Sequence, residues 1–204
     1  MVRMFCIYTV FFGLCLGIAS PARLYAENVR SGTIDAYILI DASKAMENTG
    51  EMALNWVNNA LVNDILIPGD RVQIWSITEE AELLFNDTLE NEDDVARLSS
   101  TIRSIQFTAS SADYAAALRK AVQAESSRQN RDRIAFALLI EGYDDSGKTI
   151  ESTYGDIAKL LRYSRVDDYP GWKAITVGLG IEPRVKAATA SYMEFIEELR
   201  NQGQ

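Results

Sequence analysis

Residues 33–46 read TIDAYILIDASKAM, and this stretch decides the fold. Residues 33–41 form a strongly apolar run that ends in an acid, without the regular alternation of polar and apolar residues found in a half-exposed strand. Such runs are typical of strands buried on both faces of a parallel sheet. Two later runs have the same character, residues 133–140 (RIAFALLI) and residues 172–178 (WKAITVG). We therefore expect three buried strands.

Segments with helical spacing of apolar residues separate these runs. The expected helices are residues 46–66, 93–104, 113–125, 154–166 and 185–201. Two short strands, residues 71–77 and 81–87, flank Thr78-Glu79-Glu80 and predict a hairpin. The alternation predicts an α/β fold of the doubly wound class, with a mostly parallel central sheet and helices on both faces.

In such folds, ligands bind beyond the carboxyl ends of the strands, where the strand order reverses. This rule directs attention to three stretches of the chain, residues 41–43, 141–148 and 178–180. We expect them to meet at one edge of the sheet.

The composition excludes several kinds of chemistry. The chain has 204 residues, no histidine, two cysteines and a formal net charge of −9. Without histidine there is neither a Ser-His-Asp triad nor an imidazole metal site. The acidic excess argues against a nucleic-acid partner, because phosphate contacts need clustered cations. Any site chemistry must therefore come from carboxylates, hydroxyls, Lys, Arg, Tyr and the backbone.

The first 26 residues have the pattern of a secretory signal peptide. Arg3 precedes an apolar run over residues 5–19, which small residues follow. The run is shorter than the roughly 20 residues that span a bilayer as a helix. Cleavage after Ala22 or after Ala26 fits, and the alternative is an uncleaved membrane anchor. We expect a signal peptide at 1–26, a single domain at 27–204, and a periplasmic or secreted protein that loses Cys6 and Cys15 on cleavage.

Five segments occur in a recognisable order: residues 37–46 (YILIDASKAM), 69–78 (GDRVQIWSIT), 110–122 (SSADYAAALRKAV), 136–149 (FALLIEGYDDSGKT) and 172–181 (WKAITVGLGI). Their order and spacing resemble those of von Willebrand factor type A domains, a family with a doubly wound α/β fold. The resemblance covers residues 34–199 and so nearly the whole expected domain.

The resemblance implies a metal-ion-dependent adhesion site (MIDAS) at the strand ends. In the family, hydroxyl and carboxylate oxygens hold a divalent cation there and leave one position open for a partner's carboxylate. Asp41 and Ser43 match the first Asp and first Ser of the motif, and Glu141 replaces its second Asp. Ala45 and Ala112 stand where the family has hydroxyl ligands. We therefore interpret the site as degenerate, with either no cofactor or a weakly bound Mg²⁺ or Ca²⁺.

Other polar residues lie close in sequence to the same loops. Asp113, Asp144 and Asp145 are predicted to belong to a partner-binding face. Tyr143, Tyr154, Tyr163 and Tyr169 flank the same end of the predicted sheet, and exposed tyrosines there would suit a protein interface. The alternative interpretation of Asp41 and Glu141 is that they cap helices or bind loop amides.

Residues 142–149 (GYDDSGKT) match the P-loop pattern G-x-x-x-x-G-K-[ST] and follow a buried strand. Two features argue against nucleotide binding. Asp144 and Asp145 would place two carboxylates where phosphates must lie. Gly155 interrupts the helix that should begin at Lys148.

We therefore expect an exported, non-enzymatic module that binds another protein, in the cell envelope, through the MIDAS-like face, with metal optional. Nucleic acid is not an expected partner, and a membrane is one only through an uncleaved signal segment. Two alternatives stay open: a P-loop-like nucleotide-binding protein that uses Gly142–Thr149, and a purely structural subunit of an envelope complex.

Overall fold

A computed structural model describes residues 30, 32–130, 132–143, 159–181, 184, 186 and 189–194. The strands within them are β1 (Ile34–Asp41), β2 (Arg71–Ile77), β3 (Ala81–Thr88), β4 (Ile134–Gly142), β5 (Ser164–Tyr169) and β6 (Trp172–Leu179). The helices are η1 (Lys44–Met46), α2 (Gly50–Trp56), the π-helical segment η2 (Val57–Asn63), α3 (Glu92–Arg103), α4 (Tyr114–Ser127) and the short η4 (Leu160–Tyr163). Residues 189–194 are also helical.

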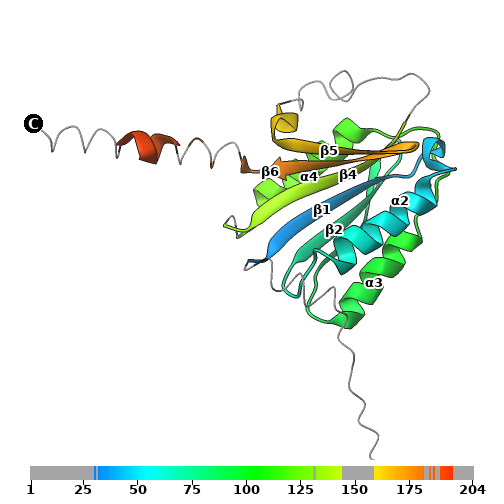
Figure 1. The fold of residues 1–204 in the computed structure, drawn as a ribbon, viewed down its shortest axis with the longest axis horizontal. Helices are drawn as coiled ribbons and strands as arrows, with labels where there is room; N and C mark the ends of the chain where they lie inside the picture. Colours follow the sequence, from blue (N-terminus) through cyan, green and yellow to red (C-terminus); the bar gives the residue numbers. More distant parts are fainter. Residues whose placement is uncertain are drawn as a thin grey trace, which may run out of the picture.

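The six strands form one sheet in the order β3-β2-β1-β4-β6-β5. The three central strands, β2, β1 and β4, are parallel, and the outer strands pair antiparallel. Helices α2 and α3 cover one face of this sheet and α4 covers the other (Figure 1). The predicted doubly wound α/β class is therefore confirmed.

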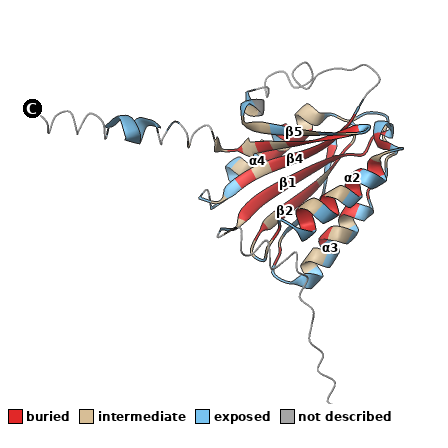
Figure 2. Ribbon diagram, in the orientation of Figure 1, coloured by how far each residue is buried: buried red, intermediate tan, exposed pale blue. Residues whose placement is uncertain are grey.

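The alternation of side chains along β1 explains the two layers. Ile38 and Ile40 belong to the core beneath α2 and α3, whereas Tyr37 and Leu39 belong to the core beneath α4. Every residue of β1 is buried, as a strand covered on both faces must be (Figure 2). This pattern is the physical reason for the unalternating apolar run in the sequence.

The other predicted elements agree closely with the structure where it describes them, except near residue 164, and of the predicted helix over residues 185–201 only 186 and 189–194 are described. The predicted helix over residues 154–166 is wrong at its end, because Ser164–Val166 belong to β5. Residues 144–158 lie outside the described part. Strand β5 lies at the edge of the sheet and none of its residues is fully buried, so its sequence, SRVDDY, lacks the long apolar run that identifies the central strands.

A tight turn joins β5 to β6 and reverses the chain. Pro170 and Gly171 lie between the paired residues Tyr169 and Trp172, and Gly171 has a φ of 83°. Proline followed by a glycine with positive φ is the signature of a type II turn. As a result, β6 runs antiparallel to β4, whereas the sequence predicted a parallel strand.

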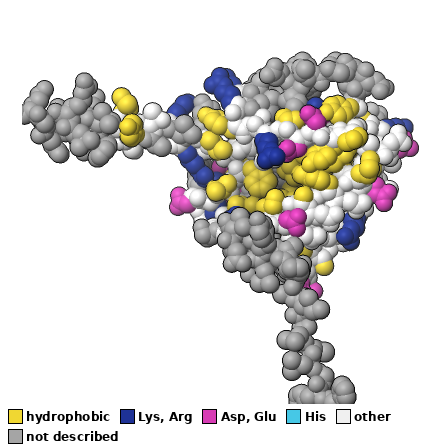
Figure 3. Space-filling view, viewed as in Figure 1, with side chains coloured by type: hydrophobic (Ala, Val, Ile, Leu, Met, Phe, Trp, Pro, Cys, Tyr) yellow, Lys and Arg dark blue, Asp and Glu magenta, His cyan; other side chains and the backbone are white. Residues whose placement is uncertain are grey.

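The β5–β6 turn packs on the aromatic end of α2. The rings of Tyr169 and Trp172 stack with centroids 4.2 Å apart, and Trp56 meets both rings at 5.6 Å. On this face of the molecule, apolar side chains form a visible patch between α2 and β5 (Figure 3). Within the described residues, no helix is both long and apolar enough to span a bilayer.

Candidate functional site

The loops that follow the parallel strands meet at one edge of the sheet. We call this edge the strand-end face and define it as residues 41–46, 78–80, 108–113, 141–143 and 168–173. Main-chain hydrogen bonds hold two of these segments together: the Ala109 amide donates to the Ala42 carbonyl (3.1 Å), and the Lys44 amide donates to the Ala109 carbonyl (2.9 Å). The predicted residues Asp41, Ser43, Glu141 and Asp113 all lie on this face.

Asp41 is completely buried at the end of β1. Its Oδ1 accepts a hydrogen bond from the Ser43 amide (2.8 Å). Its Oδ2 accepts from the Tyr114 hydroxyl (2.7 Å) and from the Gly142 amide (3.1 Å). Donors from three separate segments of the chain therefore satisfy both carboxylate oxygens.

Tyr114 reaches Asp41 because it is the first residue of α4. The preceding residue, Asp113, caps this helix: its Oδ1 accepts from the Ala116 amide at 2.8 Å. Capping fixes the first turn of a helix, and here it aims the tyrosine at the buried acid. This role of Tyr114 is not predicted from the sequence, although the residue directly follows the cap in the SSADYAAAL segment.

Glu141, the second buried acid, pairs with a lysine on the neighbouring strand. Glu141 Oε2 lies 3.4 Å from Lys173 Nζ, and both side chains are 8% exposed. The two residues are direct cross-strand partners in the antiparallel pair β4·β6. Lys173 is not among the predicted site residues, because a parallel β6 would place it at the other end of the sheet.

Tyr143 covers the same lysine from the solvent side. Lys173 Nζ lies 5.3 Å from the centroid of the Tyr143 ring, and the Tyr143 hydroxyl donates to Asp168 Oδ1 at 2.5 Å. The hydrogen bond to the Asp168 carboxylate, and secondarily burial, raise the pKa of Tyr143. The ring is nevertheless 43% exposed, so it is both fixed and accessible.

The reversal of β6 also corrects the predicted location of residues 178–180. Leu179 pairs with Ala135 at the beginning of β4, and Trp172 pairs with Gly142 at its end. The glycine-rich end of β6 therefore lies at the opposite edge from the strand-end face. Tyr163 lies at that opposite edge too, because the residue after it, Ser164, pairs with Val177, whereas Tyr169 lies on the strand-end face as predicted.

Glu79 closes the rim of the face. Its Oε1 accepts from the Ser110 amide at 3.1 Å and also from the Ser110 hydroxyl. The hydroxyl hydrogen bond lowers the pKa of Glu79. These contacts join the β2–β3 turn to residues 108–113. They also occupy the Ser110 hydroxyl, which lies two residues before Ala112, one of the positions of the MIDAS motif.

Residues 36–140, just over half of the chain, match the family model for the von Willebrand factor type A domain. The chain belongs to this family. It is a family of protein-interaction modules, and it accounts for both the central parallel strands and the position of Asp41.

Individual relatives are distant. An uncharacterized protein of Treponema pallidum (strain Nichols) is 25% identical over 168 residues, which cover 76% of this chain and 73% of the relative. The solved von Willebrand factor type A structure from Catenulispora acidiphila has a TM-score of 0.49 and 16% identity, and the match covers 65% of this chain and 30% of that one. Proximal thread matrix protein 1 from the mussel byssus, solved with zinc in its MIDAS motif, has a TM-score of 0.44 and 18% identity, over 65% of this chain and 33% of that one.

The MIDAS positions of this type A domain do not form a ligand set for Mg²⁺ or Ca²⁺ within the described residues. Ala45 and Ala112 have no side-chain oxygen. Both oxygens of Asp41 already accept hydrogen bonds, and Glu141 faces an ammonium group. Nowhere in the described ranges do three or more acidic, histidine or cysteine side chains gather as a metal site would require.

The acids predicted at the partner-binding face divide into two groups. Asp113 is exposed on the strand-end face while it caps α4. Asp144 and Asp145 lie outside the described residues, as do positions 146–149 of the P-loop-like motif. Gly142 ends β4 and Tyr143 follows it, so the structure describes only the first two residues of that motif.

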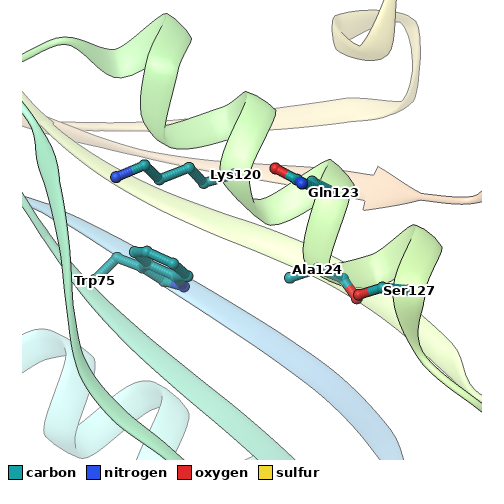
Figure 4. Close-up of a pocket in the computed structure, with 5 residues that line it drawn as sticks. All are labelled: Trp75, Lys120, Gln123, Ala124 and Ser127. Atoms are coloured by element: carbon teal, nitrogen blue, oxygen red, sulfur yellow. The ribbon is translucent and has the colours of Figure 1, made fainter.

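A separate hollow of about 370 Å³ lies between β2 and α4 (Figure 4). It is lined by Trp75, Lys120, Gln123, Ala124 and Ser127. Two of these side chains have internal partners: the Trp75 indole donates to Gln73 Oε1 (3.1 Å), and Lys120 Nζ donates to the Ala81 carbonyl (2.5 Å). The hollow is not formed by any of the predicted site residues.

Proposed function

We propose that this type A domain is an exported, non-enzymatic interaction module that binds a partner protein through the strand-end face, with metal optional. Family membership supports the general role. The absence of histidine from the whole sequence supports a role other than acid–base catalysis by imidazole. The signal-like segment at residues 1–26 supports export and a partner in the cell envelope.

The observation that carries the proposal is the geometry of Tyr143. An exposed tyrosine combines a large apolar surface with a polar tip, and such residues are enriched where binding energy concentrates. Tyr143 is held at its hydroxyl by Asp168 and at its ring face by Lys173. Little side-chain entropy remains to be lost when a partner covers it.

Exposed polar groups lie on other loops of the same strand-end face. Lys44, Glu79 and Asp113 are all exposed there. Exposed polar residues together with a fixed aromatic residue on one face are the usual composition of a protein interface. The excess of acidic groups on this face favours a partner surface that carries basic side chains, and binding should then weaken as salt is added.

The test is capture of partners from the native cell envelope with immobilised protein, followed by measurement of the affinity for each captured protein. Tyr143→Ser should weaken binding by about tenfold or more, which corresponds to a loss above about 1.4 kcal/mol. Tyr192→Ser is the matched control, since Tyr192 is 62% exposed and lies outside the strand-end face. Equal capture by both variants would refute the proposed binding face.

Export is tested separately by fractionation of cells that produce the full chain or a chain without residues 1–26. Only the full chain should reach the envelope fraction, and its mass should show the loss of the signal segment. Retention of both chains in the cytoplasm would contradict the proposed location while leaving the binding face to be judged on its own.

A further inference from the structure

We infer that Lys173 is the resident cation of the strand-end face, and that it and the Tyr114 hydroxyl take the place of the divalent ion of a MIDAS. The inference concerns the chemistry that holds the face together. It goes beyond the proposed binding function and does not depend on it.

The first step is the balance of charge. Asp41 and Glu141 occupy the two acidic positions of the motif, and they are 0% and 6% exposed. An uncompensated charge is costly to bury, so acids at such depth need a cation or several hydrogen-bond donors. Lys173, itself 6% exposed, supplies the positive charge to Glu141 at 3.4 Å.

The second step is the hydrogen bonding of Asp41, whose Oδ1 accepts one donor and whose Oδ2 accepts two. A carboxylate that binds a metal must direct an oxygen lone pair at the ion. Both oxygens of Asp41 already receive donors, and the Tyr114 hydroxyl at 2.7 Å gives the shortest of the three contacts. A hydroxyl donor on a carboxylate makes a strong charge-assisted hydrogen bond, which a metal would have to displace.

The third step is the tight packing around Asp41. A Cβ atom placed on Gly142 would lie 2.9 Å from Met46 Sδ and 3.1 Å from Asp41 Oδ2. The main chain at the end of β4 therefore packs tightly between the Asp41 carboxylate and the Met46 side chain of η1. Ala45 and Ala112, which replace the hydroxyl ligands, bring no oxygen that could rebuild a coordination shell there.

The fourth step links the lysine to the fold. Lys173 stands opposite Glu141 only because the Pro170-Gly171 turn makes β6 antiparallel to β4. The loss of hydroxyl ligands and the reversed strand are therefore complementary features, since one removes the means of holding an ion and the other delivers a fixed ammonium. Tyr143 then covers this ammonium with its ring.

The inference is tested by thermal unfolding of the purified protein in EDTA and with millimolar Mg²⁺, Ca²⁺, Mn²⁺ or Zn²⁺. We expect the wild-type Tm to be the same in all five conditions. An ion present at about 100 times its Kd would raise the Tm of a domain of this size by about 5–10 °C. A rise of that kind that is abolished by Asp41→Asn or Glu141→Gln would overturn the inference. An equal rise in the wild type and both variants locates the ion elsewhere and leaves Lys173 as the cation of this face.

Substitutions of the lysine provide the second measurement. Lys173→Met should lower the Tm by about 5–15 °C because it removes the cation that faces the buried Glu141 carboxylate. The double variant Lys173→Met/Glu141→Gln should recover most of that loss, and Lys173→Arg should retain most of the wild-type Tm. If Lys173→Met does not fold, the comparison of Lys173→Arg with Glu141→Gln serves the same purpose. Unchanged Tm values in every variant would overturn the inference.

The two proposals can fail independently. If Tyr143→Ser abolishes partner capture while metal stabilises the wild type through Asp41, the binding face is right and the lysine cation is wrong. If metals have no effect and Lys173→Met is destabilised, but Tyr143→Ser captures partners normally, the lysine cation is right and the binding face is wrong.

Discussion

The two edges of the central sheet each bury a pair of acids, but they neutralise them with different chemistry. At the strand-end face, the acids Asp41 and Glu141 are satisfied by a tyrosine hydroxyl, main-chain amides and one lysine. At the opposite edge, arginines approach the buried acids Asp35 and Asp70. We call this second edge the arginine edge and define it by these two acids with Arg30, Arg128 and Arg133.

The arginine edge joins segments that are distant in the sequence. Arg128 Nη1 lies 2.8 Å from Asp35 Oδ2, and Arg133 Nε lies 3.2 Å from Asp35 Oδ1. Asp70 accepts from Arg30 Nη1 at 3.0 Å and from the Ile34 amide at 2.9 Å. Guanidinium groups keep their charge at all accessible pH values and bind carboxylates in a fixed geometry.

This difference shows that a buried acid pair does not by itself identify a binding site. The arginine edge contains its own permanent charges and connects β1 to the loops around it, as a structural clamp does. The strand-end face satisfies its acids with a hydroxyl, main-chain amides and one ammonium, and it places the exposed Tyr143 ring over that ammonium. The strand-end face therefore combines a rigid base with an accessible surface.

The largest expected effect is at the arginine edge. Arg128→Met removes a guanidinium whose side chain is 1% exposed and that contacts both Asp35 and Glu125. The substitution leaves Asp35 buried with less compensation, so the free energy of unfolding should fall by about 3–5 kcal/mol. Urea denaturation measures the change.

Arg165→Met is the control for this prediction, because it breaks an ion pair at the surface. The Arg165 side chain is 79% exposed beside Asp167. Exposed pairs contribute little, so the change should stay within about 0.5–1 kcal/mol. Similar losses in the two variants would mean that the arginine edge is not the clamp described above.

The next effect appears only at alkaline pH. Tyr37, beneath α4, has its pKa raised to about 12, chiefly by burial and then by the charge of Asp35. In the unfolded chain, this phenol ionises near its ordinary pKa of 10.0, so the folded state holds the proton more tightly. Its contribution to stability is complete below about pH 10 and is lost as the pH rises to about 12. The loss amounts to about 2–3 kcal/mol.

Tyr37→Phe should therefore flatten the fall in unfolding free energy between about pH 9.5 and 11.5, while it changes little at neutral pH. The measurement is urea denaturation as a function of pH. Tyr192→Phe, at an exposed position, should leave the alkaline fall as it is in the wild type. An unchanged fall in Tyr37→Phe would contradict the assignment of the buried phenol.

The sequence predicts the central strands because a strand buried on both faces needs a continuous run of apolar residues. Residues 33–41 and 133–140 were recognised by their apolar runs, and they form β1 and β4 with small shifts of their ends. Asp41 and Glu141 were placed correctly at one edge because parallel strands end together. These features follow from local composition and from a general rule about sheet topology.

The chemistry around those acids could not be predicted in the same way. Lys173 depends on the direction of β6, which the Pro170-Gly171 turn and the edge strand β5 decide. The signal was present in the Pro-Gly pair, but SRVDDY has too few apolar residues to be recognised as a strand. Tyr114 depends on the rotation of α4 about its axis, which its cap and its packing on β1 decide.

A smaller effect is expected at the strand-end face. Tyr114→Phe removes the hydroxyl from Asp41 Oδ2 and leaves that oxygen with the Gly142 amide. Loss of one donor to a buried carboxylate should cost about 1–2 kcal/mol in the free energy of unfolding. Tyr192→Phe is again the control, with no expected change. A loss as large as that of Arg128→Met would remove the contrast between the two edges.

The smallest effect concerns the turn that brings Lys173 to the strand-end face. Gly171 has a φ of 83°, and a Cβ there would lie 2.7 Å from Thr49 Cγ2. Gly171→Ala should therefore lower the free energy of unfolding by about 1 kcal/mol, from backbone strain and contact with Thr49 together. Thr49→Ser should relieve the contact but not the strain, so the double variant should recover only part of the loss. Gly32→Ala, where a Cβ would meet nothing within 4 Å, is the control.

Because Lys173 is two residues from this turn, Gly171→Ala should also lower the cost of Lys173→Met in a double-mutant cycle. If the losses of unfolding free energy in Gly171→Ala and Lys173→Met are strictly additive, contacts with β4 alone hold Lys173. The turn would then set the direction of β6 without positioning the Lys173 ammonium.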